Sequence, residues 1–144
     1  MKLKCYIVIC FIMCLICSNY VKAGIVTPFE IRKYNGIHSQ FDVDDSLQMI
    51  IKKISFKVQE CNENPLIEHV TLLEEFGEGY IEYREPGADN ILFLVDLKRQ
   101  NNKTHIDIYS TWKTIKRSQQ IVKILEYAIK GLGCPGKQEM DILK

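Results

Sequence analysis

The sequence predicts an α+β domain of two layers, in which a curved antiparallel sheet of about five strands carries two helices on one face. Three observations lead to this class. An apolar stripe with helical spacing follows Asp44, four strand-like runs follow between Leu66 and Ser110, and a second helical stripe precedes Gly131. The predicted order is β-α-β-β-β-β-α, and its short connections favour an antiparallel meander over parallel crossovers.

The first strand is expected over Tyr34–Val43, after a loosely ordered start over residues 24–33. Asp44, Asp45 and Ser46 then offer side-chain oxygens to the free amides of a helix start. The helix that follows carries apolar side chains at spacings of three and four, namely Leu47, Ile50, Ile51, Ile54, Val58 and Cys61. Pro65 ends this helix, because the residue before a proline disfavours the α conformation.

Four strands are expected next, separated by glycine, proline and asparagine turns. Their ranges are Leu66–Leu73, Glu78–Arg84, Ile91–Leu97 and Lys103–Ser110. The last strand alternates, which places one set of side chains against the core and the other on the opposite face. The set expected inside is Thr104, Ile106, Ile108 and Ser110, and the other set is His105, Asp107 and Tyr109.

The second helix is expected over Thr114–Lys130, with Gly131 as the left-handed residue that follows it. Residues 24–136 therefore form a single predicted α+β domain, and residues 137–144 a flexible C-terminal tail.

Residues 1–23 have the pattern of a signal peptide. Lys2 and Lys4 precede an apolar run, and Val21 and Ala23 stand at the −3 and −1 positions of a cleavage site before Gly24. The apolar run is shorter than the ~20 residues that a membrane-spanning helix needs, so cleavage is favoured over a membrane anchor. A lipidated leader is the other alternative, since Cys10, Cys14 and Cys17 lie in the run. The expected location is the periplasm or the extracellular space, with membrane tethering only through an uncleaved or lipidated leader.

Cysteine usage predicts one disulfide. Four of the six cysteines lie in the leader, which leaves Cys61 and Cys134 in the mature domain. In an exported chain such a pair indicates a bridge more often than two thiols or half a metal site. A catalytic thiol is disfavoured because neither cysteine belongs to a C-x-x-C motif or neighbours a histidine.

The placement of three features supports a resemblance. Cys61 ends the first helix, Trp112 precedes the last, and Gly131–Cys134 follows it. In this arrangement the chain resembles small exported bacterial domains, many of them lipoproteins of unassigned function, and its element order is similar to the TATA-binding-protein-like α/β fold. The resemblance brings no active-site motif. Because it points to a bacterium, the sequon at Asn102 is interpreted as a chance match.

Charge and motif content favour binding over catalysis. Removal of Lys2, Lys4 and Lys22 leaves 16 basic against 18 acidic residues, a net charge of −2 that predicts no nucleic-acid partner. Phosphate-binding glycine loops, H-E-x-x-H and G-x-S-x-G are absent from the sequence. Residues 60–97 hold ten acidic side chains against Arg84, whereas residues 98–144 hold ten basic against four acidic ones. The leading hypothesis is a module that recognises another protein through a charged sheet face or a sheet edge, although simple solvation of the outer faces explains the same charges.

Two alternatives stay open. The first is a carrier of a small apolar ligand, with a pocket between the sheet and the last helix lined by Phe93, Tyr109 and Trp112. The second is a small hydrolase that uses His105 and Asp107, which share a strand face, as base and orienting group. No cofactor is expected, and a metal site formed by the histidines would require three strands to converge.

Overall fold

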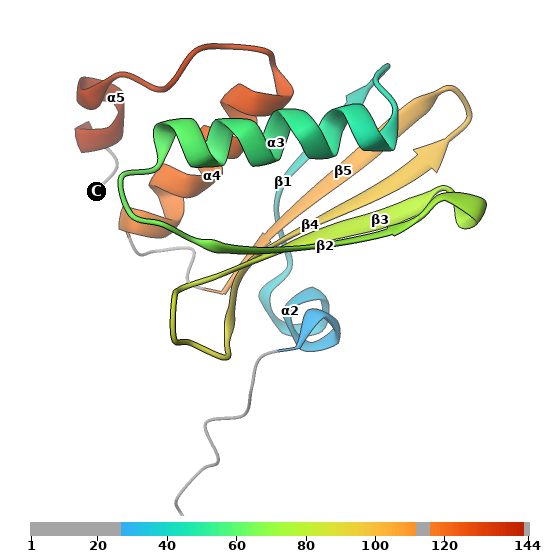
Figure 1. The fold of residues 1–144 in the computed structure, drawn as a ribbon, viewed down its shortest axis with the longest axis horizontal. Coiled ribbons are helices and arrows are strands. Elements are labelled where there is room, and N and C mark those ends of the chain that lie inside the picture. Colours follow the sequence, from blue (N-terminus) through green and yellow to red (C-terminus); the bar gives the residue numbers. More distant parts are fainter. Residues whose placement is uncertain (1–26, 112–115, 143–144) are drawn as a thin grey trace, which may run out of the picture.

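The computed structural model describes residues 27–111 and 116–142, which form a five-stranded antiparallel sheet with helices on both of its faces (Figure 1). The strand order is β1-β5-β4-β3-β2. The elements are α2 (Pro28–Asn35), β1 (Ile37–Val43), α3 (Leu47–Cys61), β2 (Ile67–Leu73), the 3-10 turn η1 (Glu74–Phe76), β3 (Glu78–Arg84), β4 (Ile91–Gln100), β5 (Lys103–Ser110), α4 (Lys116–Ile129) and α5 (Lys137–Ile142). This architecture confirms the predicted α+β class.

The strand predictions agree closely with the structure. The bounds of β3 and β5 are those expected, whereas β4 runs three residues further, to Gln100. The extension arises because Asn101 adopts a left-handed conformation with φ of 57°. The resulting two-residue turn lets the ladder continue until Gln100 pairs with Lys103.

The main core lies between the sheet and the two long helices, which pack side by side on one face of the sheet (Figure 1). α3 begins at Ser46, whose side-chain oxygen accepts a hydrogen bond from the Met49 amide at 3.3 Å. As expected, Gly131 follows α4 in a left-handed conformation, with φ of 68°. The amide of Leu132 donates to the Tyr127 carbonyl at 2.9 Å, which completes a Schellman motif.

An additional helix, α2, covers part of the opposite face, where the sequence analysis expected only a loosely ordered start. Its first turn is closed by a capping box, in which Thr27 and Glu30 each accept a backbone hydrogen bond from the other. Ile31 is fully buried and anchors α2 to the sheet. Its partners in this second, smaller cluster are Ile91, Leu94, Tyr109 and Tyr80.

The C-terminal segment also differs from the expectation of a flexible tail, because residues 137–142 form the short helix α5. The Gln120 side-chain amide donates to the Met140 carbonyl at 3.0 Å, and the Tyr127 hydroxyl donates to the Glu139 carboxylate. These bonds connect α5 to α4.

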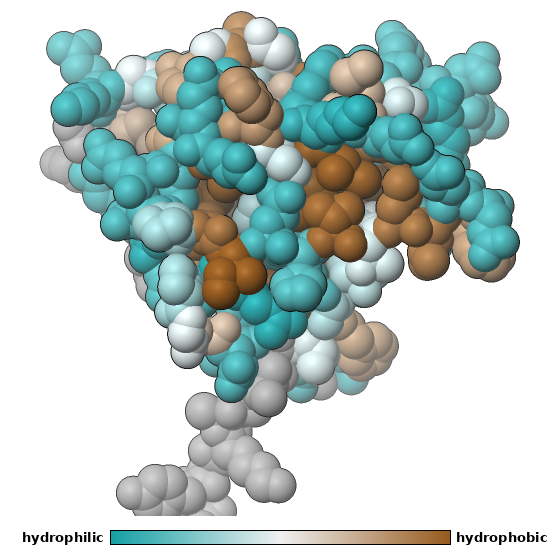
Figure 2. All heavy atoms as spheres, in the orientation of Figure 1, coloured by the Kyte–Doolittle hydropathy of each residue, from teal (hydrophilic) through white to brown (hydrophobic). Residues whose placement is uncertain are grey.

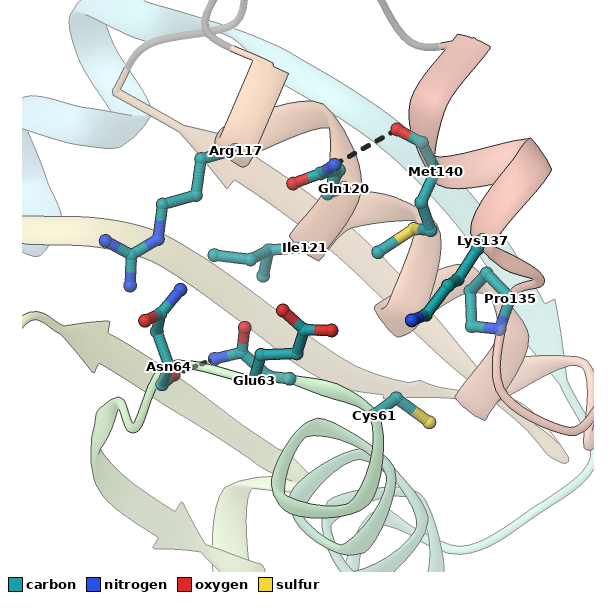
Figure 3. Close-up of a pocket in the computed structure, with 10 residues that line it drawn as sticks. Cys61, Glu63, Asn64, Arg117, Gln120, Ile121, Pro135, Lys137 and Met140 are labelled. Carbon is teal, nitrogen blue, oxygen red and sulfur yellow. Dashed lines mark hydrogen bonds between the residues drawn. The ribbon is translucent and has the colours of Figure 1, made fainter.

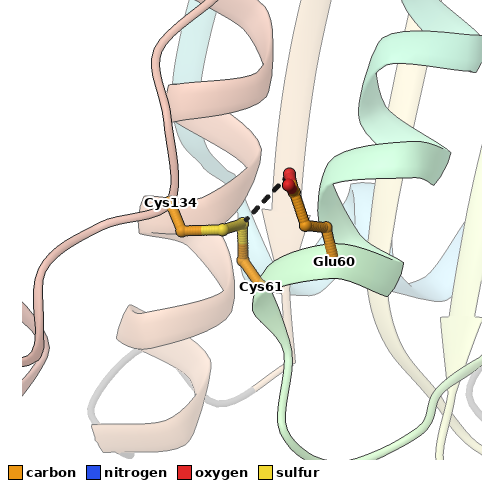
Figure 4. A group of neighbouring side chains, drawn as sticks. All are labelled: Glu60, Cys61 and Cys134. Atoms are coloured by element: carbon orange, nitrogen blue, oxygen red, sulfur yellow. Dashed lines mark hydrogen bonds between the residues drawn. A yellow bond between two sulfur atoms is a disulfide. The ribbon is translucent and has the colours of Figure 1, made fainter.

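The predicted disulfide is present and joins Cys61, the last residue of α3, to Cys134 beyond the end of α4 (Figure 4). The two Cα atoms lie 5.4 Å apart, within the normal range. Such a bridge is typical of proteins that fold in an oxidising compartment. No helix in residues 27–111 and 116–142 is long and apolar enough to cross a membrane, and the expected leader falls outside the described residues.

Replacing both cysteines, Cys61→Ala with Cys134→Ala, should lower the free energy of unfolding by roughly 2–4 kcal/mol, because the bridge closes a long loop in the unfolded chain. Urea unfolding of the variant and of the wild type, each with and without reductant, measures this. Reductant should bring the wild type to the stability of the variant, and an equally stable variant would show that the bridge contributes nothing.

Candidate functional site: the outer sheet face and the β2 edge

The face of the sheet opposite α3 and α4, here called the outer face, is only partly covered by α2. Beside α2 it forms an open groove of about 510 Å³ across β3, β4 and β5. The groove is polar and contains both signs of charge. The charged side chains that line it are Arg32, Glu78, Asp96, Lys98, His105 and Asp107.

Each charge in the centre of this groove has a partner of opposite sign. Asp96 and Asp107 stand directly opposite each other on β4 and β5, an arrangement that is repulsive unless cations neutralise it. Arg32 reaches across from α2 and binds Asp96 through two nitrogens, at 2.5 and 2.6 Å. His105 lies 3.2 Å from Asp107 on the other side, and Lys98 pairs with Glu78 at 2.7 Å.

His105 is held between two carboxylates. Its Nδ1 lies 2.8 Å from Asp42 of β1, while its Nε2 faces Asp107. The hydrogen bond to Asp42 raises the pKa of His105, and the nearby charge of Asp107 adds to the rise against a smaller effect of burial. An imidazolium with both nitrogens bound has no lone pair to accept a proton, so this geometry opposes a role as a general base.

The hydrolase hypothesis therefore predicts the positions of its two residues correctly, but their hydrogen bonds do not suit the proposed acid–base chemistry. His105 and Asp107 share a face, as their spacing predicts, but they form part of an ion-pair network. The residues that line the groove include no serine, threonine or cysteine. The sequence pattern gave no sign of Arg32 or Asp42, which arrive from other elements.

The aromatic residues proposed to line an apolar pocket do not share one. Phe93 is buried in the main core under the helices, whereas Tyr109 packs under α2 on the outer face. The reason is the register of β4 and β5, in which Phe93 pairs with Ser110 rather than with Tyr109. Trp112, the third residue of that hypothesis, falls outside the described residues.

The strand order leaves β2 at one edge of the sheet, with three exposed apolar side chains. Ile67, Val70 and Leu73 are each 43% exposed, and no proline, lysine or arginine interrupts the strand. Phe56 of α3 and Phe76 of η1 are also exposed, over about two thirds of each side chain. Figure 2 shows brown side chains in the region where α3 and β2 lie in Figure 1, with hydrophilic side chains around them.

The other edge strand, β1, is flanked by charged side chains from α4. Glu126 accepts a hydrogen bond from Ser39 at 3.0 Å, and the Lys130 ammonium lies 5.6 Å from the centre of the Phe41 ring. Charged side chains along an edge discourage pairing with another strand. Within the described residues the two edges therefore differ, and β2 is the one that presents large exposed apolar side chains. His69 lies exposed on β2.

The rim of β2 is acidic. Residues 60–83 contain seven carboxylates and no lysine or arginine. Three of the seven are paired elsewhere, Glu60 with Lys57, Glu78 with Lys98 and Glu82 with Arg84. The others border β2 and form no ion pair with a described residue, namely Glu63, Glu68, Glu74 and Glu75.

A separate pocket of about 330 Å³ lies beside the disulfide, between the ends of α3 and α4 and the helix α5 (Figure 3). Its walls are mainly polar and include two cations, Lys137 and Arg117, of which Arg117 pairs with Glu85. The neighbouring group of Glu60, Cys61 and Cys134 has the spacing of metal ligands. Both sulfurs are consumed by the disulfide, so they offer no thiolate to a metal.

No protein-family model matches this chain, and a search of curated proteins finds no match. The resemblance to small exported bacterial domains thus stays a prediction from the sequence.

Titration of His105 should make stability depend on pH. Because its pKa is raised in the folded state, its stabilisation is complete below the ordinary value of about 6.5 and is lost as the pH rises through the folded-state pKa. His105→Gln should therefore lower the free energy of unfolding by roughly 0.5–1 kcal/mol at pH 5.5 and by much less at pH 9.

Urea unfolding at the two pH values measures this difference, with His69→Gln on the exposed edge as the matched control. A His105→Gln effect that is equal at both pH values would mean that the imidazolium is not held by its carboxylates.

Proposed function

We propose that this protein is an exported, disulfide-closed domain that acts by binding another protein, and that β2 with its apolar flanks is the contact surface. The leader pattern over residues 1–23 supports export, and so does the bridge between Cys61 and Cys134. The domain would work in the periplasm or the extracellular space.

The observation that carries the proposal is the exposed edge of β2. An edge strand presents backbone N–H and C=O groups that have no ladder partner on one side. An extended segment of a partner can bind them as an added strand, while pockets for alternate side chains select its sequence. Three half-exposed apolar side chains along a seven-residue strand provide the contact area for such a segment.

The groove on the outer face is less suited to this role. Its central charges already satisfy one another through Arg32, Asp96, His105 and Asp107. A ligand would have to break these ion pairs before it gained its own contacts. The apolar-carrier alternative gains no support either, because each of the pockets described here is partly lined by charged or amide side chains.

Photocrosslinking tests the contact surface. A benzoylphenylalanine at position 70, in the cells that produce the protein, should give a defined crosslinked product, whereas the same group at Asp44, an exposed turn position, should not. Ile67→Lys combined with Leu73→Lys should reduce the product at least fivefold and change stability by less than about 0.5 kcal/mol, because both side chains are at the surface. Equal products at both positions, or a product that survives the double change, would refute the assignment.

Intact-mass measurement tests export. The mature protein should begin at Gly24 and should accept two alkyl groups only after reduction of the bridge. A mass that begins at Cys17 with added acyl chains would identify a lipoprotein, and one that begins at Met1 would contradict cleavage.

A further inference from the structure

We propose that the segment bound at β2 carries an arginine or lysine side chain, which enters a pocket between the end of α3 and β2 and binds Glu68 and Glu63. This inference rests on the proposed function, because it concerns the identity of the strand that β2 receives. Three features support it: the pocket itself, the hydrogen bonds that orient Glu68, and the negative charge of the rim.

The pocket has a volume of about 280 Å³ and lies on the side of β2 that faces α3. Glu68 pairs with Tyr83, whose ring belongs to the main core, so the carboxylate points to the helix side of the sheet. Val70 lies two residues further along β2 and shares this face. A strand added beside β2 would direct every second side chain toward the same side, where the pocket is open.

Glu68 is oriented by two hydroxyl groups. The Ser55 hydroxyl donates to Oε1 at 2.7 Å, and the Tyr83 hydroxyl donates to Oε2 at 2.8 Å. Burial raises the pKa of Tyr83 far above its ordinary value, and the negative charge of Glu68 adds to the rise, so the phenol stays a donor. Both donors are neutral, and they occupy about half of the acceptor sites of a carboxylate. The remaining sites suit a guanidinium or an ammonium.

The other walls match the stem of a long basic side chain. Val58 and Leu66 supply apolar surface, and Glu63 supplies a second carboxylate at the exposed rim. Arginine and lysine bury their methylene groups along such surfaces while the charged end stays near carboxylates or water. Lys57, the cation nearest along the chain, pairs with Glu60 at 2.7 Å. Arg84 pairs with Glu82 on the opposite face of the sheet.

Charge complementarity also distinguishes the possible occupants. A second copy of the chain would present the same edge, with seven carboxylates and no lysine or arginine between residues 60 and 83. Like charges along two paired edges oppose association. A different chain that alternates apolar and basic side chains meets both requirements, because its apolar side chains cover Ile67 and Leu73 on one face while its basic side chains lie beside Glu68 on the other.

Synthetic peptides test the proposal directly. The probes are nine-residue capped peptides of alternating valine and threonine, in which one side chain is arginine, its neutral isostere citrulline, or glutamate. Fluorescence anisotropy gives their affinities, and hydrogen exchange reports whether the β2 amides become protected. The arginine peptide should protect β2 and bind at least tenfold more tightly than the citrulline peptide, with the difference shrinking at high salt.

Variants assign the effect to the pocket. Glu68→Gln, which keeps an acceptor for one hydroxyl, should reduce the preference for arginine to less than threefold. Asp44→Asn makes the same change of charge on an exposed turn and should preserve the preference. Ser55→Ala retains the charge of Glu68 and serves as a second test if Glu68→Gln weakens the fold, which circular dichroism would reveal. Ser55→Ala should reduce the preference for the arginine peptide without abolishing it.

The outcomes separate the inference from the proposed function. Equal affinities for the arginine and citrulline peptides, with the β2 amides still protected, would overturn the requirement for a basic side chain. The proposed addition of a strand at β2 would still stand. Absence of protection with every peptide would overturn both. A dimer in sedimentation experiments that Ile67→Lys abolishes would assign the edge to a second copy and would also overturn the proposal.

Discussion

Two helices cannot fully cover a five-stranded sheet, and this limit of width determines where the surface of the protein is open. Strands are spaced at about 4.8 Å, so five span about 24 Å, whereas two packed helices span about 18–20 Å. α3 and α4 contact β1, β3 and β4 through their apolar stripes, and β2 is left at the rim. The exposure of Val70, on the face that turns toward α3, follows from this geometry.

The spacing of apolar residues predicted the elements that face the main core, because a helix or strand with one buried face repeats its apolar residues with its own period. α2 was missed because an eight-residue helix has too few turns to show a stripe, and only Ile31 anchors it fully. Its capping box at Thr27 was nevertheless present in the sequence. The error over Phe93 and Tyr109 was also avoidable in principle. A two-residue turn at Asn101 sets the register of β4 against β5, and that register places the two rings on opposite faces.

Tertiary contacts neutralise part of the charge segregation that the sequence shows. Several acidic residues of the central segment are neutralised by cations distant in the chain, as Asp96 is by Arg32 and Glu85 by Arg117. Sequence counts cannot reveal these pairings, because they depend on which elements pack together. Five acidic residues of this segment form no ion pair with a described residue; four of them border β2, and the fifth, Asp89, lies between β3 and β4. The sequence therefore predicted an acidic surface, and the fold determines its position.

The acidic rim resolves a conflict that an open edge strand creates. An apolar, unpaired strand promotes self-association, and carboxylates beside it oppose this by repulsion between copies. In the proposed function the same charges would attract a basic segment, so protection and recognition would require the same residues. The disulfide adds rigidity at the point where this matters, since Cys61 ends α3 immediately before Asn62 and Glu63. In the proposed function, fixing that turn would hold the pocket wall in place before the partner binds, which would lower the entropy lost on binding.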